Sequence, residues 1–268
     1  MTLVKLIIKK IIEMIKMLII GIQQLYFQIK GSNVECNICH CKADKFKSNT
    51  WHKYCDCPRC RSGVRQRLIM ASLSNLDKFG FDKIIKNKKV LHFAPEKSLG
   101  KVISGKAREY KTADLLAGGY SYHKIDFNMD ISDMKNIKNE TFDCVIACDV
   151  LEHVPDHQKG MQEIHRVLKK DGYCILTVPQ KDNLEITFED STVVDKKERE
   201  KIFGQWDHLR IYGDDFKDIL QNNGFEVTAV NETFFEQDIV DHYVLFPPVL
   251  SENPLATNYR KIFFGRKR

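Results

Sequence analysis

Short apolar runs alternate with longer polar stretches from Lys89 to the end of the chain, and this alternation is the main structural signal of the sequence. The apolar runs predict strands at residues 90–93, 110–113, 142–147, 173–178, 225–230 and 259–264. Apolar residues at helical spacing predict helices, most clearly at residues 157–169 and 213–222, with another at 63–76. Such alternation predicts an α/β fold with a parallel sheet covered on both faces, and a ligand site at the carboxyl ends of its strands.

The first thirty residues have a different pattern. Ile, Leu and Met predominate there, while Lys5, Lys9, Glu13 and Lys16 fall on one stripe of a helix, which predicts an amphipathic helix over residues 1–30. The uncharged run from Met17 to Ile29 has 13 residues, fewer than the roughly 20 that span a bilayer. Two interpretations remain open: a helix lying on a membrane surface, or one docked on the protein's own core or on a partner.

Length and charge refine this picture. The chain has 268 residues, enough for an α/β domain of about 200 residues with an appendage. Residues 1–70 contain 13 Lys and Arg against 4 Asp and Glu, so the basic character is N-terminal. A basic front end favours phosphate-rich partners or an anionic membrane surface without choosing between them. The cysteines form no disulfide framework, which favours a reducing compartment and hence the cytoplasm, with peripheral membrane contact through residues 1–30 left open.

Two Cys-x2-Cys pairs, separated by 17 residues, predict a zinc ribbon over residues 31–62. The predicted ligands are Cys36, Cys39, Cys57 and Cys60, although His40, Cys41, His52 and Cys55 are close enough in sequence to replace one of them. Four thiolates leave no open coordination position, so the zinc ion would be structural. Lys and Arg residues interleaved with Phe46, Trp51 and Tyr54 surround the module, a mixture that either binds nucleic acid or forms an ordinary solvated surface.

Acidic residues follow successive predicted strands. Asp114 follows the second strand, where a carboxylate can accept hydrogen bonds from ribose hydroxyls. Asp130, followed by Ile131, ends the stretch 125–129, where an acceptor could meet an adenine amino group, and Asp149 follows the strand at 142–147. Each alone is more often a helix cap than a ligand, but together they predict a nucleoside site.

The region from Phe142 to Gly172 resembles class I methyltransferases of the type 11 group, with the segment Asp149-Val150-Leu151-Glu152-His153-Val154 and the helix ending Arg166-Val167-Leu168-Lys169. The chain also resembles a narrower set in which a zinc ribbon ending Cys-Pro-Arg-Cys precedes the methyltransferase. The resemblance implies a seven-stranded Rossmann-like sheet with a reversed last strand over residues 63–268. It also implies methyl transfer from S-adenosylmethionine.

The first strand departs from the usual pattern of these enzymes, because an acidic residue and a glycine-rich loop are replaced by His92-Phe93-Ala94-Pro95-Glu96. This loop lacks the glycines that cradle phosphates, which argues against NAD. Ala94 is still small enough for a cofactor to approach. Glu96 either pairs with the cofactor's ammonium group or merely begins the next helix.

Candidate general bases are His153, which follows the fourth strand, and His208, which lies in the insertion after the fifth. Asp207 and Arg210 flank His208 and could bind a polar or anionic substrate. The acceptor could be a small molecule, a glycan, a lipid-linked molecule or a nucleic acid. A competing hypothesis is a non-catalytic scaffold that uses its zinc ribbon and basic N-terminus to bind nucleic acid or a protein. The charged segment 195–201 predicts a helix that could serve as a lid.

Overall fold

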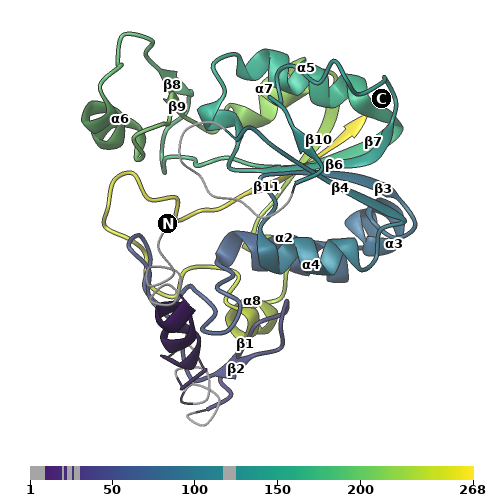
Figure 1. The fold of residues 1–268 in the computed structure, drawn as a ribbon. Coiled ribbons are helices and arrows are strands. Elements are labelled where there is room, and N and C mark those ends of the chain that lie inside the picture. Colours follow the sequence, from purple (N-terminus) through teal and green to yellow (C-terminus); the bar gives the residue numbers. More distant parts are fainter. Residues whose placement is uncertain (1–9, 20, 23–25, 27–30, 117–124) are drawn as a thin grey trace.

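The structure is a computed structural model that describes residues 10–19, 21–22, 26, 31–116 and 125–268. Its largest element is a mixed sheet of seven strands in the order β10-β11-β7-β6-β3-β4-β5 (Figure 1). The strands are β3 (Lys89–Phe93), β4 (Glu109–Asp114), β5 (Phe127–Asn128), β6 (Phe142–Cys148), β7 (Leu168–Thr177), β10 (Phe225–Val230) and β11 (Ile262–Lys267). β11 runs antiparallel to both of its neighbours, β10 and β7, and the other paired strands are parallel, which confirms the predicted α/β sheet with a reversed last strand.

The central strands are apolar on both faces because helices cover both faces. In β6, every residue except Asp143 is buried. One face packs against α5 (His157–Val167) and α7 (Phe216–Asn222), and the other against α2 (Val64–Asn75), α3 (Phe81–Ile84), α4 (Lys97–Ser104) and α8 (Gln237–Tyr243). Two buried apolar clusters, one on each face, form the core of this region.

Several predicted boundaries differ from the observed ones. The strand predicted to begin at Tyr173 begins at Leu168, because α5 already ends at Val167 and Leu168 adopts an extended conformation. The last strand begins at Ile262 instead of Tyr259, since the backbone amides of Asn258 and Tyr259 donate hydrogen bonds to Asp182 outside the sheet. The two-residue strand β5 was absent from the six predicted strands, because so short a run carries little periodicity.

The cysteine module folds around β1 (Val34–Glu35) and β2 (Lys42–Ala43), which pair antiparallel. Its buried side chains, among them Ile38 and Phe46, form one cluster with Val244 from the segment after α8. Arg67 of α2 is fully buried beneath this cluster. Its guanidinium donates hydrogen bonds to the carbonyls of Cys55 and Ser62 in the module and of Tyr243 and Val244 at the end of α8. The module is therefore packed against the sheet domain.

An insertion between β7 and α7 contains α6 (Lys196–Phe203) and a small antiparallel pair of strands, β8 (Phe188–Glu189) and β9 (Arg210–Ile211). The Asp195 side chain accepts hydrogen bonds from the backbone amides of Lys197 and Glu198 and so caps α6. The charged segment thus forms the expected helix, and short 3-10 turns occur at η1 (Asp77–Phe79), η2 (Leu151–His153) and η3 (Glu232–Phe234).

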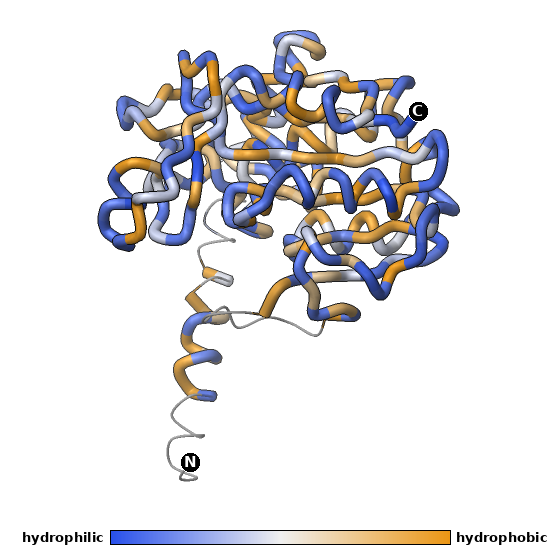
Figure 2. Tube along the Cα trace, turned by 90° about the horizontal axis from the view of Figure 1, so that it is seen from above, coloured by the Kyte–Doolittle hydropathy of each residue, from blue (hydrophilic) through white to orange (hydrophobic). Residues whose placement is uncertain are grey.

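Residues 10–19 are helical, and all of their side chains are exposed. Figure 2 shows this helix extending from the body of the molecule, with hydrophobic and hydrophilic residues both present on it. Lys5 and Lys9 of the predicted charged stripe lie outside the described residues. Within the described residues, no helix combines the length and apolar content needed to cross a bilayer.

Candidate active site

A cavity of about 820 Å³ opens at the carboxyl ends of the strands, where the strand pattern predicted a ligand site. Residues that end or follow successive strands line it, namely Phe93, Ala94, Asp114, Met129, Asp130, Asp149 and Pro179. Other parts of the chain complete its walls, including the module at 49–56, the start of α2 at 63–66, the turn at 150–155, the insertion at 203–208 and the segment at 255–260. The cysteine module is thus one wall of the cavity.

Two of the predicted cofactor carboxylates lie at neighbouring strand ends in this cavity. Asp114 ends β4, and its buried Oδ2 has no hydrogen-bond partner among the described residues. Burial raises the pKa of this carboxyl group. Asp130 lies beyond β5 and accepts hydrogen bonds through Oδ1 from the backbone and hydroxyl of Ser132, at 2.7 and 2.8 Å. Ile131, which is 3% exposed, supplies an apolar surface beside it.

Two strands turn sharply at the cavity through residues with left-handed backbone conformations. Ala94 has φ 44° directly after β3, and its amide donates a 2.9 Å hydrogen bond to Ala113. Asp149 has φ 51° directly after β6, and its amide donates to Thr177. These conformations disfavour residues with a side chain, so surrounding contacts must hold them. Ala94 thereby makes the turn after β3 without a glycine.

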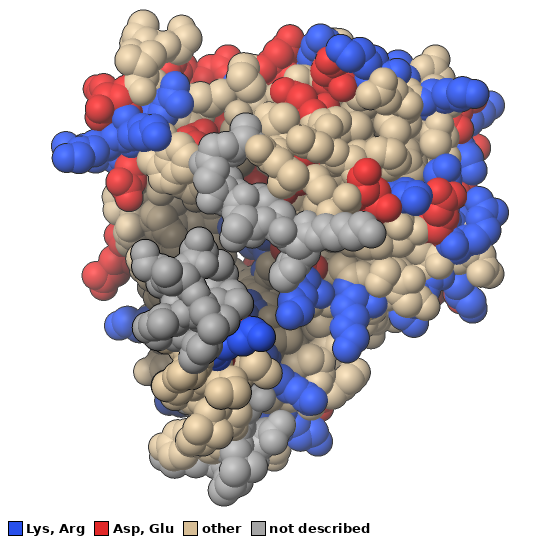
Figure 3. Space-filling model, viewed as in Figure 1, with Lys and Arg blue, Asp and Glu red and all other residues tan. Residues whose placement is uncertain are grey.

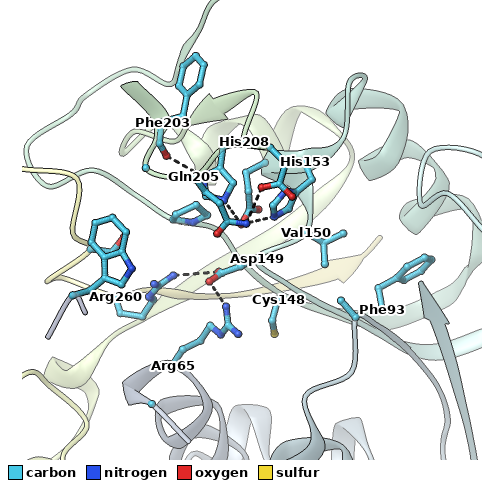
Figure 4. A pocket seen from close by; sticks show the side chains of 18 of the residues that line it. Arg65, Phe93, Cys148, Asp149, Val150, His153, Phe203, Gln205, His208 and Arg260 are labelled. Atoms are coloured by element: carbon cyan, nitrogen blue, oxygen red, sulfur yellow. Dashed lines mark hydrogen bonds and ion pairs between the residues drawn. The ribbon is translucent and has the colours of Figure 1, made fainter. Parts of the chain in front are cut away.

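Asp149 lies between two arginines (Figure 4). Arg65 of α2 and Arg260, just before β11, both form ion pairs with its carboxylate, the latter at 3.2 Å. Burial favours the neutral acid, but the two guanidiniums outweigh it and lower the pKa of Asp149 to about 2. Asp149 is therefore a carboxylate at neutral pH, with its charge compensated within the cavity wall.

Glu96 and Arg210 have other contacts and are not among the described residues that line the cavity. Glu96 pairs with Arg65 at 2.8 Å and with His92 Nε2 at 3.2 Å. Arg210 is 3% exposed and donates hydrogen bonds to the carbonyls of Leu151, Val154 and Pro155. Each side chain therefore holds a cavity-forming segment in place from behind.

His153, His208 and Glu152 form a cluster at the cavity wall. The imidazole rings lie 4.7 Å apart between centroids, nearly perpendicular to each other. Glu152 Oε1 is 3.9 Å from His153 Nε2 and 4.0 Å from His208 Nε2. Burial lowers the pKa of His208, and His153 lowers it further, so His208 is neutral at neutral pH. Its Nδ1 donates to the Phe203 carbonyl at 2.9 Å, which leaves the Nε2 lone pair facing the cluster.

Asp207 also lines the cavity, where its Oδ2 lies 3.4 Å from His153 Nδ1. Its Oδ1 accepts a 2.8 Å hydrogen bond from Gln205. The insertion thus brings Asp207 and His208 against the turn after β6. Of the two residues that flank His208 in the predicted substrate set, Asp207 faces the cavity and Arg210 lies behind it.

The sulfur atoms of Cys36, Cys39, Cys57 and Cys60 lie within 4.8 Å of one another. The Cys36–Cys60 and Cys39–Cys57 Sγ distances are both 3.6 Å, close to the roughly 3.8 Å edge of a tetrahedron with 2.3 Å zinc–sulfur bonds. Ser62 Oγ lies 3.3 Å from Cys36 Sγ and 3.2 Å from Cys60 Sγ. His40, Cys41, His52 and Cys55 lie outside this four-sulfur group. The geometry therefore suits a tetrahedral metal ion.

The basic and aromatic residues around the module do not form one exposed surface. Arg67 and Phe46 are buried, while Arg65 and Trp51 line the cavity. On the face shown in Figure 3, Lys and Arg predominate over the lower part of the molecule, and both charge signs are interspersed over the upper part.

Sequence reasoning missed three residues of this site. Glu152 belongs to the recognised motif, and its position three residues after Asp149 places it on the same turn. Arg65 and Arg260 gave no signal, because each is one basic residue among many and meets Asp149 only in the folded chain.

Residues 86–176 match a protein family described as a methyltransferase domain. An uncharacterised protein of Methanocaldococcus jannaschii is 33% identical over 115 residues, which cover 42% of this chain and 42% of that protein. The chain thus matches less than half of the length of this curated relative.

Two solved structures also resemble the chain. The 1,6-didemethyltoxoflavin N1-methyltransferase of Burkholderia thailandensis, which carries bound S-adenosylhomocysteine, is 13% identical over 76% of this chain and 78% of its own, with a TM-score of 0.49. An S-adenosylmethionine-dependent methyltransferase of Archaeoglobus fulgidus is 13% identical over 75% of this chain and 94% of its own, with a TM-score of 0.48.

Proposed function

Because residues 86–176 match a methyltransferase domain and lie within a seven-stranded sheet, we propose that the chain transfers a methyl group from S-adenosylmethionine to an acceptor bound beside His153 and His208. The observation that carries this proposal is Asp114 Oδ2, a buried acceptor at the end of β4 that lines the cavity and has no hydrogen-bond partner among the described residues. A buried acceptor without a partner is costly, and ribose hydroxyls would satisfy it.

Residues at the other strand ends would make the remaining contacts with the cofactor. Asp130 would accept from the adenine amino group, with Ile131 against the ring, and the Asp149 carboxylate would pair with the ammonium of the methionine moiety. Ala94 has only a methyl side chain, so its turn permits close approach. When bound, S-adenosylmethionine supplies a methyl group on a positively charged sulfur, and the protein's task is to align the acceptor and exclude water.

The acceptor would lie under the insertion, against His153, His208 and Asp207. His208 is neutral and has its Nε2 lone pair free of the Phe203 contact, so this atom can take a proton from an acceptor hydroxyl or amine. Asp207 orients His153 through Nδ1. Both histidines therefore act at the acceptor end of the cavity.

We further propose that Cys36, Cys39, Cys57 and Cys60 hold a zinc ion. Their spacing and mutual sulfur distances suit tetrahedral thiolate coordination, and Ser62 can donate to one of the thiolates. The ion would stabilise the module that forms one wall of the cavity. Thiolates of this kind persist in a reducing compartment, which supports a cytoplasmic location.

The test is calorimetric titration of zinc-loaded protein with S-adenosylmethionine and S-adenosylhomocysteine. Asp114→Ala and Asp130→Ala should each weaken binding at least tenfold, whereas the exposed Asp133→Ala, which is outside the cavity lining, should bind normally. Failure of folded, zinc-loaded wild-type protein to bind either compound would overturn the proposal. That result would favour the non-catalytic scaffold.

A further inference from the structure

The cluster of Glu152, His153 and His208 has the composition of a metal-binding triad, separate from the four cysteines. Its three potential ligand atoms lie within 4.8 Å of one another. Ligands about 2.1 Å from one ion lie roughly 3.0 to 3.4 Å apart in octahedral or tetrahedral geometry. The observed separations of 3.9 and 4.0 Å from Glu152 Oε1 exceed these by about 0.5 to 1 Å, so small side-chain rotations would close the site.

Both imidazoles are oriented as metal ligands usually are. A ligating histidine binds the metal through one ring nitrogen and donates from the other to a carboxylate or a backbone carbonyl. His208 donates from Nδ1 to the Phe203 carbonyl, and His153 Nδ1 faces the Asp207 carboxylate. The Nε2 atoms of both rings therefore face Glu152 with their lone pairs available.

Glu152 supplies an independent observation. Its side chain is 1% exposed, and Oε2 has no hydrogen-bond partner among the described residues. An ionised carboxylate buried in this way is costly, so Glu152 is ionised only where a cation compensates it. Among the described residues, no lysine or arginine forms an ion pair with Glu152, and the nearby Arg65 and Arg260 pair with Asp149. The position between the two imidazoles is therefore suited to a cation.

We propose that Glu152, His153 and His208 bind one divalent transition-metal ion at the acceptor end of the cavity. Two imidazoles and one carboxylate favour Mn²⁺, Fe²⁺, Co²⁺ or Zn²⁺ over Mg²⁺, and three protein ligands leave positions open. All three residues line the cavity, so an oxygen of the acceptor can occupy an open position. The assignment of this end of the cavity to the acceptor rests on the proposed function, but ion binding itself does not depend on it.

The ion would change what the histidines do. An Nε2 atom bound to a metal no longer accepts a proton, so the acceptor's proton would pass to solvent, and the ion would lower the pKa of the bound hydroxyl. With such an ion in place, the acceptor would be a molecule that carries an oxygen ligand next to the atom that is methylated.

Ion binding can be measured on the full chain with zinc already in the cysteine module. Titration with Mn²⁺, followed by the loss of the free-ion electron paramagnetic resonance signal, should show one further ion per chain. Co²⁺ should bind at the same place and give visible absorption bands without the intense thiolate charge-transfer bands expected for cysteine ligation. If neither ion binds to the zinc-loaded wild type, the inference is wrong.

Substitutions of the proposed ligands test where the ion binds. Glu152→Gln and His208→Gln should weaken Mn²⁺ binding more than 100-fold, and Asp207→Asn should weaken it by about 10- to 100-fold, as for other residues that orient a ligand. His242→Gln, a partly exposed histidine remote from the cavity lining, should bind as the wild type does. Equal affinity in all four variants would place the ion elsewhere and overturn the assignment.

Two controls keep the outcomes separable. Zinc content and circular dichroism establish that each variant is folded. If removal of a ligand unfolds the chain, Asp207→Asn still tests the site, because it leaves the three proposed ligands in place. S-adenosylhomocysteine titration of Glu152→Gln reports on the cofactor site alone. Retained cofactor binding with lost Mn²⁺ binding supports both proposals, whereas Mn²⁺ binding without any cofactor binding would leave the metal site standing and refute the methyltransferase.

Discussion

The guanidinium of Arg65, in the first turn of α2, pairs with the carboxylate of Asp149 at the end of β6. The two residues are far apart in sequence and join the segment that follows the cysteine module to the centre of the cavity. Because Arg65 also pairs with Glu96, it connects the turns that follow β3 and β6. Arg65, which lies outside the matched residues 86–176, therefore holds two cavity-forming turns together.

A double-mutant cycle should reveal this coupling. Arg65→Met and Asp149→Asn each leave a buried partner without full compensation. The double variant should therefore lose less unfolding free energy than the sum of the losses in the two single variants. We expect a coupling free energy of about 1 to 3 kcal/mol. Urea unfolding of the four proteins measures it, and effects that add to within about 0.5 kcal/mol would refute direct coupling.

The Asp149 pair should also make stability depend on pH. Its pKa in the folded protein is lowered to about 2, below the value of roughly 3.9 in an unfolded chain. A lowered folded pKa stabilises the protein above the unfolded pKa, and this contribution is lost as the pH falls toward the folded pKa. The difference in unfolding free energy between the wild type and Asp149→Asn should therefore shrink by about 1 kcal/mol between pH 7 and pH 3.

Urea unfolding at the two pH values measures this change. The exposed Glu252→Gln serves as the control, since it should keep a constant offset from the wild type. If the difference in unfolding free energy between the wild type and Asp149→Asn stays constant or grows in acid, Asp149 is not held as a carboxylate.

Loss of the proposed zinc ion should disrupt the cavity. Trp51, His52, Cys55 and Asp56 belong to the module and line the cavity, so unfolding of the module would remove a wall. We expect Cys57→Ser to lose zinc, to melt at a lower temperature and to bind S-adenosylhomocysteine at least tenfold more weakly. Cys41→Ala, which changes a buried cysteine outside the four-sulfur group, should keep its zinc. Unchanged ligand binding by zinc-free Cys57→Ser would show that the module is dispensable for the cavity.

Arg67 should be among the most sensitive positions for stability. Its fully buried guanidinium donates to carbonyls in the module and at the end of α8, so Arg67→Met would leave several buried acceptors unpaired. We expect a loss of about 3 kcal/mol or more in unfolding free energy, against less than about 0.5 kcal/mol for Arg108→Ala on the surface. Chemical unfolding followed by circular dichroism compares them, and similar stabilities of the two variants would contradict the role assigned to Arg67.

The sequence by itself predicted the sheet and the strand-end positions of Asp114, Asp130 and Asp149. A buried parallel strand needs an apolar run, so β3 and β6 could be located from their apolar runs alone. Asp114, Asp130 and Asp149 could then be predicted to lie together, because the carboxyl ends of parallel strands meet at one edge. The cysteine spacing likewise predicted the four sulfurs that the fold brings within 4.8 Å.

Only the tertiary structure decided which side chains face the cavity and which support it from behind. Arg210 and Asp207 are neighbours in one short segment, yet Arg210 is buried against three carbonyls while Asp207 lines the cavity. Glu152, His153 and His208 meet because the insertion folds back over η2, where the Leu209 amide donates to the Glu152 carbonyl. Local pattern encodes backbone conformation and burial, but contacts between distant segments depend on how loops close, and no periodicity records that.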